Sequence, residues 1–285
     1  MTAIPDTSTL AKVESTSTRR PSRRVPRWLP FVTTPGIVVV FVIAWAILSG
    51  AGKISPLVLP SPRAVLDAFV TDVGQGYVWT HGVLITLEET VLGFALGLAG
   101  GLILGYFMGK YVLVNSIASP FVIASQVVPK VALMPLFILW FGFGVTSKIA
   151  ISAMLSFFPI LTNVALGVRS VPPPMNEMLT SFNSSRWQRF RKLEAPSVLP
   201  YMLAGCEVAI VLSLIGAVVG EYLGGTDGLG SLVIAAQSQL NIADLYSTIL
   251  LMTLLGFLLY SIVALGKRVL IPWHESVRVH QRQDS

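Results

Sequence analysis

The chain has 285 residues, of which 53% are hydrophobic and 12% are charged, and its formal net charge at pH 7 is +6. Soluble domains have about a quarter of their residues charged, so this composition excludes a soluble domain and predicts a membrane protein. The single cysteine, Cys206, excludes an internal disulfide and a cysteine-rich metal site. The basic residues lie beside apolar segments, which favours membrane orientation over nucleic-acid binding.

The N-terminal part is polar and then apolar. Residues 1–30 are rich in Ser, Thr and Arg, so we expect a disordered basic tail on the cytoplasmic side. Residues 36–51 are the first predicted transmembrane helix. A cleaved signal peptide is the alternative, because small residues follow the apolar run, but the long basic leader and the later spans favour a retained helix. Residues 31–80 then comprise this helix, an extracytoplasmic loop and a surface helix, because Pro56, Pro60 and Pro62 forbid a second span there.

A second span is predicted over residues 82–108. Glycines recur along it at every fourth residue, which lets the backbone of a neighbouring helix approach closely. No strand precedes them, so they are not a nucleotide-binding motif. The predicted packing glycines are Gly93, Gly97, Gly101, Gly105 and Gly109.

Four more apolar segments follow. The third, residues 112–129, continues through Lys130, and prolines 120, 129 and 135 should kink or break it. The fourth, fifth and sixth spans cover about residues 149–168, 201–223 and 245–265, with a Gly-rich turn and a short helix before the last. The sequence therefore predicts an all-α, polytopic protein with six transmembrane helices, a core over residues 81–271 and a cytoplasmic tail over 272–285.

The distribution of basic residues predicts the orientation. If both termini are cytoplasmic, six spans place most of the 20 Lys and Arg residues inside. Lys53, Arg63 and Lys148 then lie outside, and Lys130 lies within the membrane. The positive-inside rule favours this multi-pass arrangement in a cytoplasmic membrane.

Residues 170–200 form the one long polar interval between apolar segments, and this topology places them in the cytoplasm. After three prolines, Asn176 is a candidate N-cap for a short helix over residues 177–182. Asn183 suits a left-handed turn. Ser184 or Ser185 can cap a second short helix that ends before Pro196, with Pro200 in the first turn of the next span. By composition alone, a solvated loop on lipid headgroups is the alternative.

The spacing in this interval resembles the E-A-A-x3-G-x9-I-x-L-P motif of permease subunits of ATP-binding-cassette importers. Glu177, Asn183 and Pro196 take the acidic, glycine and proline positions, and Leu193 takes that of isoleucine. The chain departs from the motif where Met178, Leu179 and Ala195 replace its two alanines and its leucine. The resemblance implies that residues 177–183 are a coupling helix against an ATPase, with these coupling residues: Glu177, Met178, Leu179, Phe182, Asn183, Trp187, Leu193 and Pro196.

The resemblance extends from about residue 54 to 271. LPSPRAVLDAF, PKVALMPLFILWFGFG, SSRWQRF and EYLGGTDGLGSLV occur in the order typical of the nitrate, sulfonate and taurine branch of these permeases. It implies a type I importer permease fold with cytoplasmic coupling helices, a homodimer, two ATPase subunits that bind ATP and Mg, and an extracytoplasmic substrate-binding protein.

The chain lacks an ATPase motif of its own. Walker A loops need G-x4-G-K-[ST], and the nearest match, Gly52-Lys53, is followed by Ile54. The three histidines are scattered, which argues against an enzyme and against a metal site. We therefore expect no catalytic residue and no cofactor bound by this chain.

Ionisable residues in the spans need partners or water, because charge at bilayer depth is costly. Glu88, Glu89, Glu207, Glu221 and Lys130 either form interhelical pairs and interfacial anchors or line a path for the solute. On the second hypothesis the translocation cavity contains Gln126, Lys130, Asn163, Glu221 and Gln237, and the cationic Lys130 suits an anion. An ion-coupled secondary transporter that uses these carboxylates, or a scaffolding subunit, is the rival interpretation.

Overall fold

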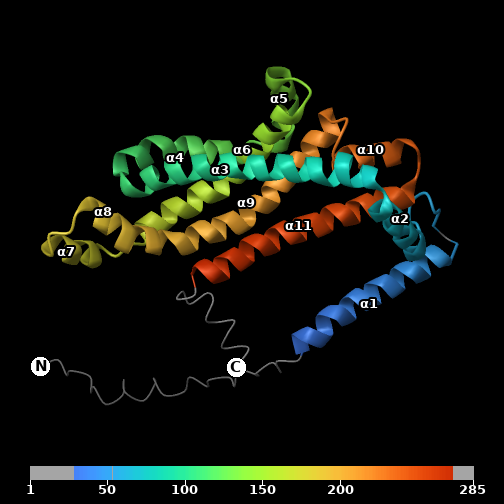
Figure 1. Cartoon of the computed structure of the whole chain (residues 1–285), viewed down its shortest axis with the longest axis horizontal. Coiled ribbons are helices and arrows are strands. Elements are labelled where there is room, and N and C mark those ends of the chain that lie inside the picture. Colours follow the sequence, from blue (N-terminus) through green and yellow to red (C-terminus); the bar gives the residue numbers. More distant parts are fainter. Residues whose placement is uncertain (1–28, 53, 272–285) are drawn as a thin grey trace, which may run out of the picture. The chain divides into compact units, whose positions relative to one another are not determined.

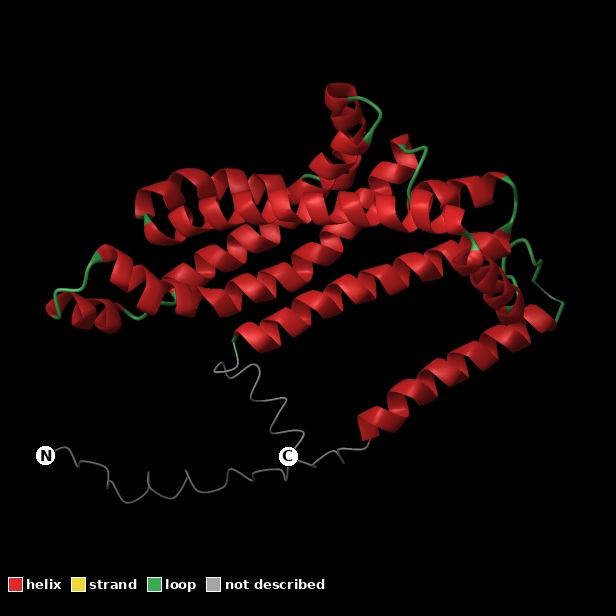
Figure 2. Ribbon diagram, viewed as in Figure 1, coloured by secondary structure: helices red, strands yellow, loops and turns green. Residues whose placement is uncertain are grey.

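A computed structural model of the chain describes residues 29–52 and 54–271. Within these ranges every regular element is a helix (Figure 2). The chain divides into two compact units, residues 1–43 and 44–285. Of the first unit, only the beginning of α1 (Leu29–Gly50) is described, and all later helices belong to the second. The predicted basic tail, apart from its last two residues in α1, and the predicted C-terminal tail lie outside the described residues.

The predicted spans are helical. Four described segments are long and apolar enough to cross a membrane: Val78–Lys110, Val145–Arg169, Arg186–Gly224 and Ile242–Leu270. The pair Val112–Val127 and Lys130–Phe141, bent by 88°, can form a fifth. The first predicted span forms the apolar helix Pro35–Gly50, which is shorter than the others. These four long segments extend beyond the predicted limits of their spans, because hydropathy marks only the apolar part of a helix.

Three helices form the packed centre of the second unit: α3 (Leu84–Lys110), α6 (Val145–Arg169) and α9 (Ala195–Gly224) (Figure 1). The glycine repeat of α3 lies against α6. A Cβ atom added to Gly97 would lie 2.1 Å from Ser156 Oγ and 2.7 Å from the carbonyl oxygen of Ala153. Because only hydrogen fits there, the two backbones approach closely.

The prolines of the third segment act differently from one another. Pro120 lies inside α4 (Val112–Val127) without breaking it. The break falls at Pro129, after which the 3-10 turn Lys130–Leu133 leads into α5 (Met134–Phe141). Pro135 occupies the first turn of α5, where a missing N–H leaves no carbonyl unpaired.

The two ends of the second unit carry different short helices (Figure 1). At one end are the predicted surface helix, α2 (Pro62–Gly74), and α10 (Leu229–Ser238), next to the start of α11 (Ile242–Leu270). Asp72 of α2 accepts a hydrogen bond from Ser247 of α11. At the opposite end are α7 (Pro173–Ser181) and α8 (Arg186–Arg189).

Candidate functional site

The helix α7 begins earlier than predicted. Pro172 occupies its N-cap position and Pro173 its first turn, so the expected cap at Asn176 is wrong and that residue lies inside the helix. Proline at the first helical position needs no hydrogen-bond acceptor and already has a helical φ angle. The prolines that end α6 therefore also begin α7.

A left-handed residue ends α7. Asn183 has a φ angle of +50°, as its residue type predicts. Its N–H donates to the carbonyl oxygen of Thr180 at 2.9 Å, and Ser184 Oγ donates to that of Leu179 at 2.6 Å. These bonds pair the last carbonyls of the helix and turn the chain sharply toward α8.

Ser185 begins the second short helix. Its hydroxyl accepts the N–H of Gln188 at 3.2 Å, while Gln188 Oε1 accepts the N–H of Ser185 at 2.8 Å, which is a capping box. The predicted end before Pro196 is wrong, because α8 continues through the π turn Phe190–Glu194 directly into α9. A wider turn lets the helix pass into a proline-containing stretch without a break. Pro200 consequently lies inside α9 and not in its first turn.

We call α7, the Asn183 turn and α8 the knob, residues 173–189. Its tip is apolar and open: Met178 is 54% exposed, Phe182 76% and Trp187 66%. Arg189 donates to Thr180 Oγ1 at 3.0 Å and so joins the two short helices. Large apolar side chains held outward on a rigid segment are typical of a surface that binds another protein.

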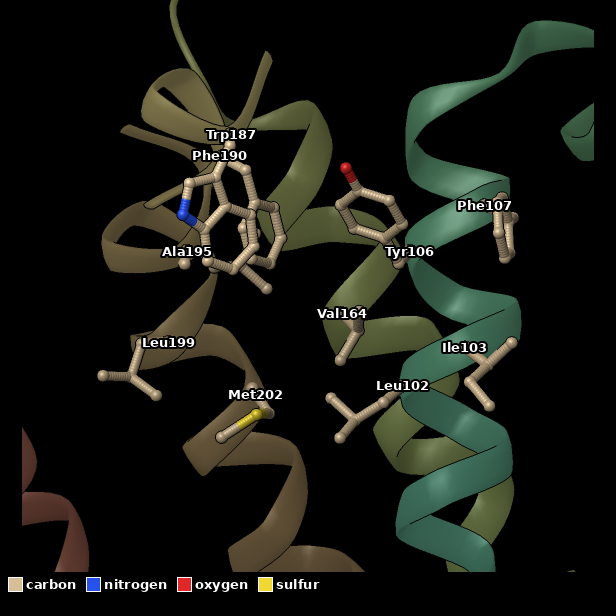
Figure 3. Close-up of a pocket in the computed structure, with 11 residues that line it drawn as sticks. Leu102, Ile103, Tyr106, Phe107, Val164, Trp187, Phe190, Ala195, Leu199 and Met202 are labelled. Carbon is tan, nitrogen blue, oxygen red and sulfur yellow. The ribbon is translucent and has the colours of Figure 1, made fainter. Parts of the chain in front are cut away.

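The knob is attached to the end of α3. Tyr106 donates to Glu194 Oε2 at 2.7 Å, and Lys110 forms an ion pair with the same oxygen at 3.0 Å. Phe190 stacks on Trp187 and meets the Tyr106 ring edge-on. Below these rings is an apolar cavity of about 560 Å³ between α3 and α9 (Figure 3). Sequence reasoning missed this attachment, which depends on the rotation of two helices.

A buried polar cluster ties α3, α6 and α9 at the other end. Lys148 pairs with Glu89 at 2.8 Å and is buried between the helices. Glu221 is 1% exposed and accepts hydrogen bonds from Thr86 Oγ1 and the N–H of Gly230, each at 2.7 Å. Glu89 lies four residues before Gly93, and this spacing is the sequence signal that places it against α6.

An exposed contact lies beside that cluster. His81 Nδ1 and Asp227 Oδ1 are 2.9 Å apart, and the N–H of Gly228 donates to the carbonyl oxygen of His81 at 2.6 Å. The hydrogen bond with His81 holds the pKa of Asp227 below its ordinary value of 3.8. The contact fastens the Gly-rich turn to the start of the second span.

The structure places the five predicted cavity residues in different surroundings. Glu221 belongs to the buried cluster between the helices. Asn163 donates to the carbonyl oxygen of Pro159, and Gln237 lies on the exposed end of α10. Lys130 lies over the Phe158 ring at 4.7 Å. Gln126 lines a cavity between α4 and α6 together with other polar residues.

Known proteins match both the sequence and the fold. A family model described as "binding-protein-dependent transport system inner membrane component" matches residues 97–274. The riboflavin transport system permease protein RibX of Chloroflexus aurantiacus is 36% identical over 87% of this chain and 92% of its own length. The formylaminopyrimidine transport permease protein ThiX of Halalkalibacterium halodurans is 33% identical over 77% of this chain and 87% of its own length. The taurine transport system permease protein TauC of Escherichia coli is 29% identical over 93% of this chain and 98% of its own length.

A solved structure agrees. A chain from the inward-facing MetNI methionine ABC transporter has a TM-score of 0.54 and 18% identity, over 68% of this chain and 96% of its own length. Long packed helices, a bent span and an exposed knob of two short helices define a transport subunit of the membrane. The chain belongs to the binding-protein-dependent transport system inner membrane component family. It is a multi-pass permease subunit of an ATP-binding-cassette importer, which works with a separate ATPase and a substrate-binding protein.

Proposed function

We propose that this permease imports a small organic or inorganic anion of the nitrate, sulfonate or taurine type, and that the knob couples it to the ATPase. The observation that carries the coupling is the exposed Phe182 at the end of α7, beside the left-handed Asn183. An apolar side chain on a helix of two turns can insert into a groove of a partner.

The attachment of the knob supports its coupling role. Movement of α7 reaches α8 through the bond between Arg189 and Thr180. It reaches α9 because α8 and α9 are continuous through the π turn. Tyr106 and Lys110 hold Glu194, so α3 receives the same displacement. A rigid-body motion of the knob therefore acts on two of the three central helices.

The assembly we propose contains two copies of this chain and two ATPase subunits, which bind ATP and Mg. Both chain termini are cytoplasmic in this proposal. The basic residues support that orientation, since Arg169, Arg186, Arg189, Arg191 and Lys192 cluster at the end that carries the knob. Energy then enters from the ATPase side, because this chain has no Walker A sequence.

The anionic class of the solute rests on Lys130. Its ammonium group lies at the bend between α4 and α5, over the Phe158 ring, and no described carboxylate lies within ion-pairing distance. A cation in a membrane span without an acidic partner suits an anionic ligand. The names of the relatives cover riboflavin, a formylaminopyrimidine and taurine, so the family alone sets no single solute.

The rival, a carrier that uses membrane carboxylates as proton relays, has less support. Glu89 pairs with Lys148 and Glu207 with Lys267, while Glu221 accepts two hydrogen bonds. Carboxylates held in this way act as interhelical ties. Membership of the importer family gives the chain a different energy source.

The test is transport and ATP hydrolysis by the reconstituted complex. We expect insertion of one residue after Asn183, or Glu177→Ala, to leave hydrolysis in place and to reduce transport at least several-fold. Asn183→Gly is the matched control, because glycine adopts a positive φ angle without strain. Normal transport by both altered complexes would exclude the knob as the coupling element, while membrane insertion of every variant confirms that the fold persists.

A further inference from the structure

A polar stripe runs along the groove between α4 and α6. On α4, positions 115, 119 and 126 recur at helical spacing and share one face. On α6, Thr162 and Arg169 lie opposite. The cavity between them has a volume of about 350 Å³, which is the size of a small-molecule site. Its polar lining residues are Asn115, Ser119, Gln126, Thr162 and Arg169.

The hydrogen bonds in this groove leave donors in excess. Asn115 Oδ1 accepts from the guanidinium of Arg169 and from Ser119 Oγ, the second at 3.1 Å. Both lone pairs of that oxygen are then used, and the amide N–H groups of Asn115 remain as donors. One guanidinium nitrogen of Arg169 also donates to the carbonyl oxygen of Met108 at 3.1 Å. The remaining N–H groups of that guanidinium are available to a ligand.

The charge of the groove is uncompensated. None of the residues that line it is acidic. No described carboxylate lies within ion-pairing distance of Arg169 or Lys130. Lys130 lies after the break that ends α4, over the ring of Phe158, which is on the same face of α6 as Thr162, one turn before it. Phe158 and Arg169 are 11 positions apart on the continuous helix α6, about 16 Å along its axis, so the two cations stand toward opposite ends of the groove.

We propose that the groove between α4 and α6 is an anion-binding site on the cytoplasmic side of the transport path, with Arg169 and Asn115 as its binding groups. Arginine presents several N–H donors in one plane and matches the oxygens of a sulfonate, carboxylate or nitrate. The chemical class of the ligand rests on the proposed function. The binding site itself rests on the geometry and charge of the groove.

Cysteine reactivity tests the site without measuring transport. The chain's one cysteine, Cys206, is buried, so Cys206→Ser gives a background without thiols. Ser119→Cys then places a thiol in the groove. Its modification rates by an anionic reagent, sulfonatoethyl methanethiosulfonate, and a cationic one, trimethylammonioethyl methanethiosulfonate, are measured in inside-out vesicles that contain the complete importer. The ratio of the two rates cancels any change in thiolate fraction.

We expect the anionic reagent to modify Ser119→Cys faster than the cationic reagent. Arg169→Gln should lower the ratio of the anionic to the cationic rate by about fivefold or more at low salt, because a nearby positive charge is lost. Added salt should weaken the preference. Val269→Cys is the matched control, because this residue, at the proposed cytoplasmic end of α11, is 77% exposed and does not line the groove. Its ratio should be unchanged by Arg169→Gln.

The outcomes separate the sources of an anion. Preference for the anionic reagent in native vesicles and in nanodiscs of phosphatidylcholine alone supports a solute site. If the anionic reagent is preferred only in phosphatidylcholine, which has no anionic headgroup, then an anionic lipid fills the groove in native vesicles. That result would overturn the proposal. Equal rates in both membranes, with and without Arg169, would also overturn it. Because ATP coupling plays no part in this measurement, a failed coupling test leaves the result intact.

Discussion

The hydroxyl of Tyr106 donates a hydrogen bond of 2.7 Å to the carboxylate of Glu194, and this bond joins the end of α3 to the π turn before α9. Lys110 holds the same carboxylate from the next turn of α3. The end of α3 thus touches the one segment that connects the knob to the membrane helices.

Tyr106→Phe removes this bond and keeps the ring that packs on Phe190. A hydrogen bond to a charged group contributes about 1.5 to 3 kcal/mol, so we expect the free energy of unfolding to fall by about that amount or less, since Lys110 still pairs with Glu194. Transport per ATP hydrolysed should fall because α3 is no longer fastened to the knob. Both quantities are measured on the reconstituted complex. An unchanged transport ratio would show that α3 does not need this attachment.

The glycine face of α3 offers a matched pair. A Cβ atom at Gly97 would lie 2.1 Å from Ser156 Oγ, whereas one at Gly100 would meet only the Phe157 ring at 3.3 Å. Overpacking a helix contact costs about 1 to 3 kcal/mol, so Gly97→Ala should lower the thermal midpoint of the purified chain. Gly100→Ala should change it far less. Equal effects of the two substitutions would contradict the close packing of α3 on α6.

The buried pair of Glu89 and Lys148 should be intolerant of single changes. Lys148→Met leaves the Glu89 carboxylate buried without its partner, and breaking such a pair costs about 3 to 5 kcal/mol. Combining it with Glu89→Gln removes the unpaired charge and should restore most of the loss. The measurement is the yield and thermal midpoint of the folded chain in detergent. A double variant no more stable than Lys148→Met would indicate that the pair is not the cause.

The contact between His81 and Asp227 predicts a dependence on pH. Since the pKa of folded Asp227 lies below its ordinary 3.8, the contact stabilises the fold above that value and is lost as pH falls through the lower folded pKa. The difference in thermal midpoint between the wild type and Asp227→Asn should therefore shrink as pH falls below about 4. A difference that grows with acidity would have the wrong sign.

Local features of the knob could be predicted from the sequence because they depend on neighbours in the chain. The left-handed Asn183 and the capping Ser185 need only adjacent backbone groups. Asn176 was wrongly predicted as a cap because Pro173, a competing start three residues earlier, also satisfies local rules. In this competition the residue that already has helical geometry begins the helix.

Contacts between distant helices could not be predicted in the same way. Hydropathy locates α3, α6 and α9, but the pairing of Glu89 with Lys148 depends on how each helix is rotated. The glycine repeat carries part of that information, since it marks the face of α3 that lies on α6. No comparable repeat marks Tyr106 or Glu194, and their contact emerges only from the packed structure.

Site-specific photo-cross-linking from the knob tests the central claim most directly. A benzoylphenylalanine placed at Phe182, 76% exposed, should form an adduct with the ATPase subunit in intact membranes, and Phe257, 70% exposed on α11, serves as the control position. We predict an ATPase adduct from position 182 and none from position 257. Absence of the adduct at 182 in a complex that still hydrolyses ATP and transports its solute would contradict coupling through the knob.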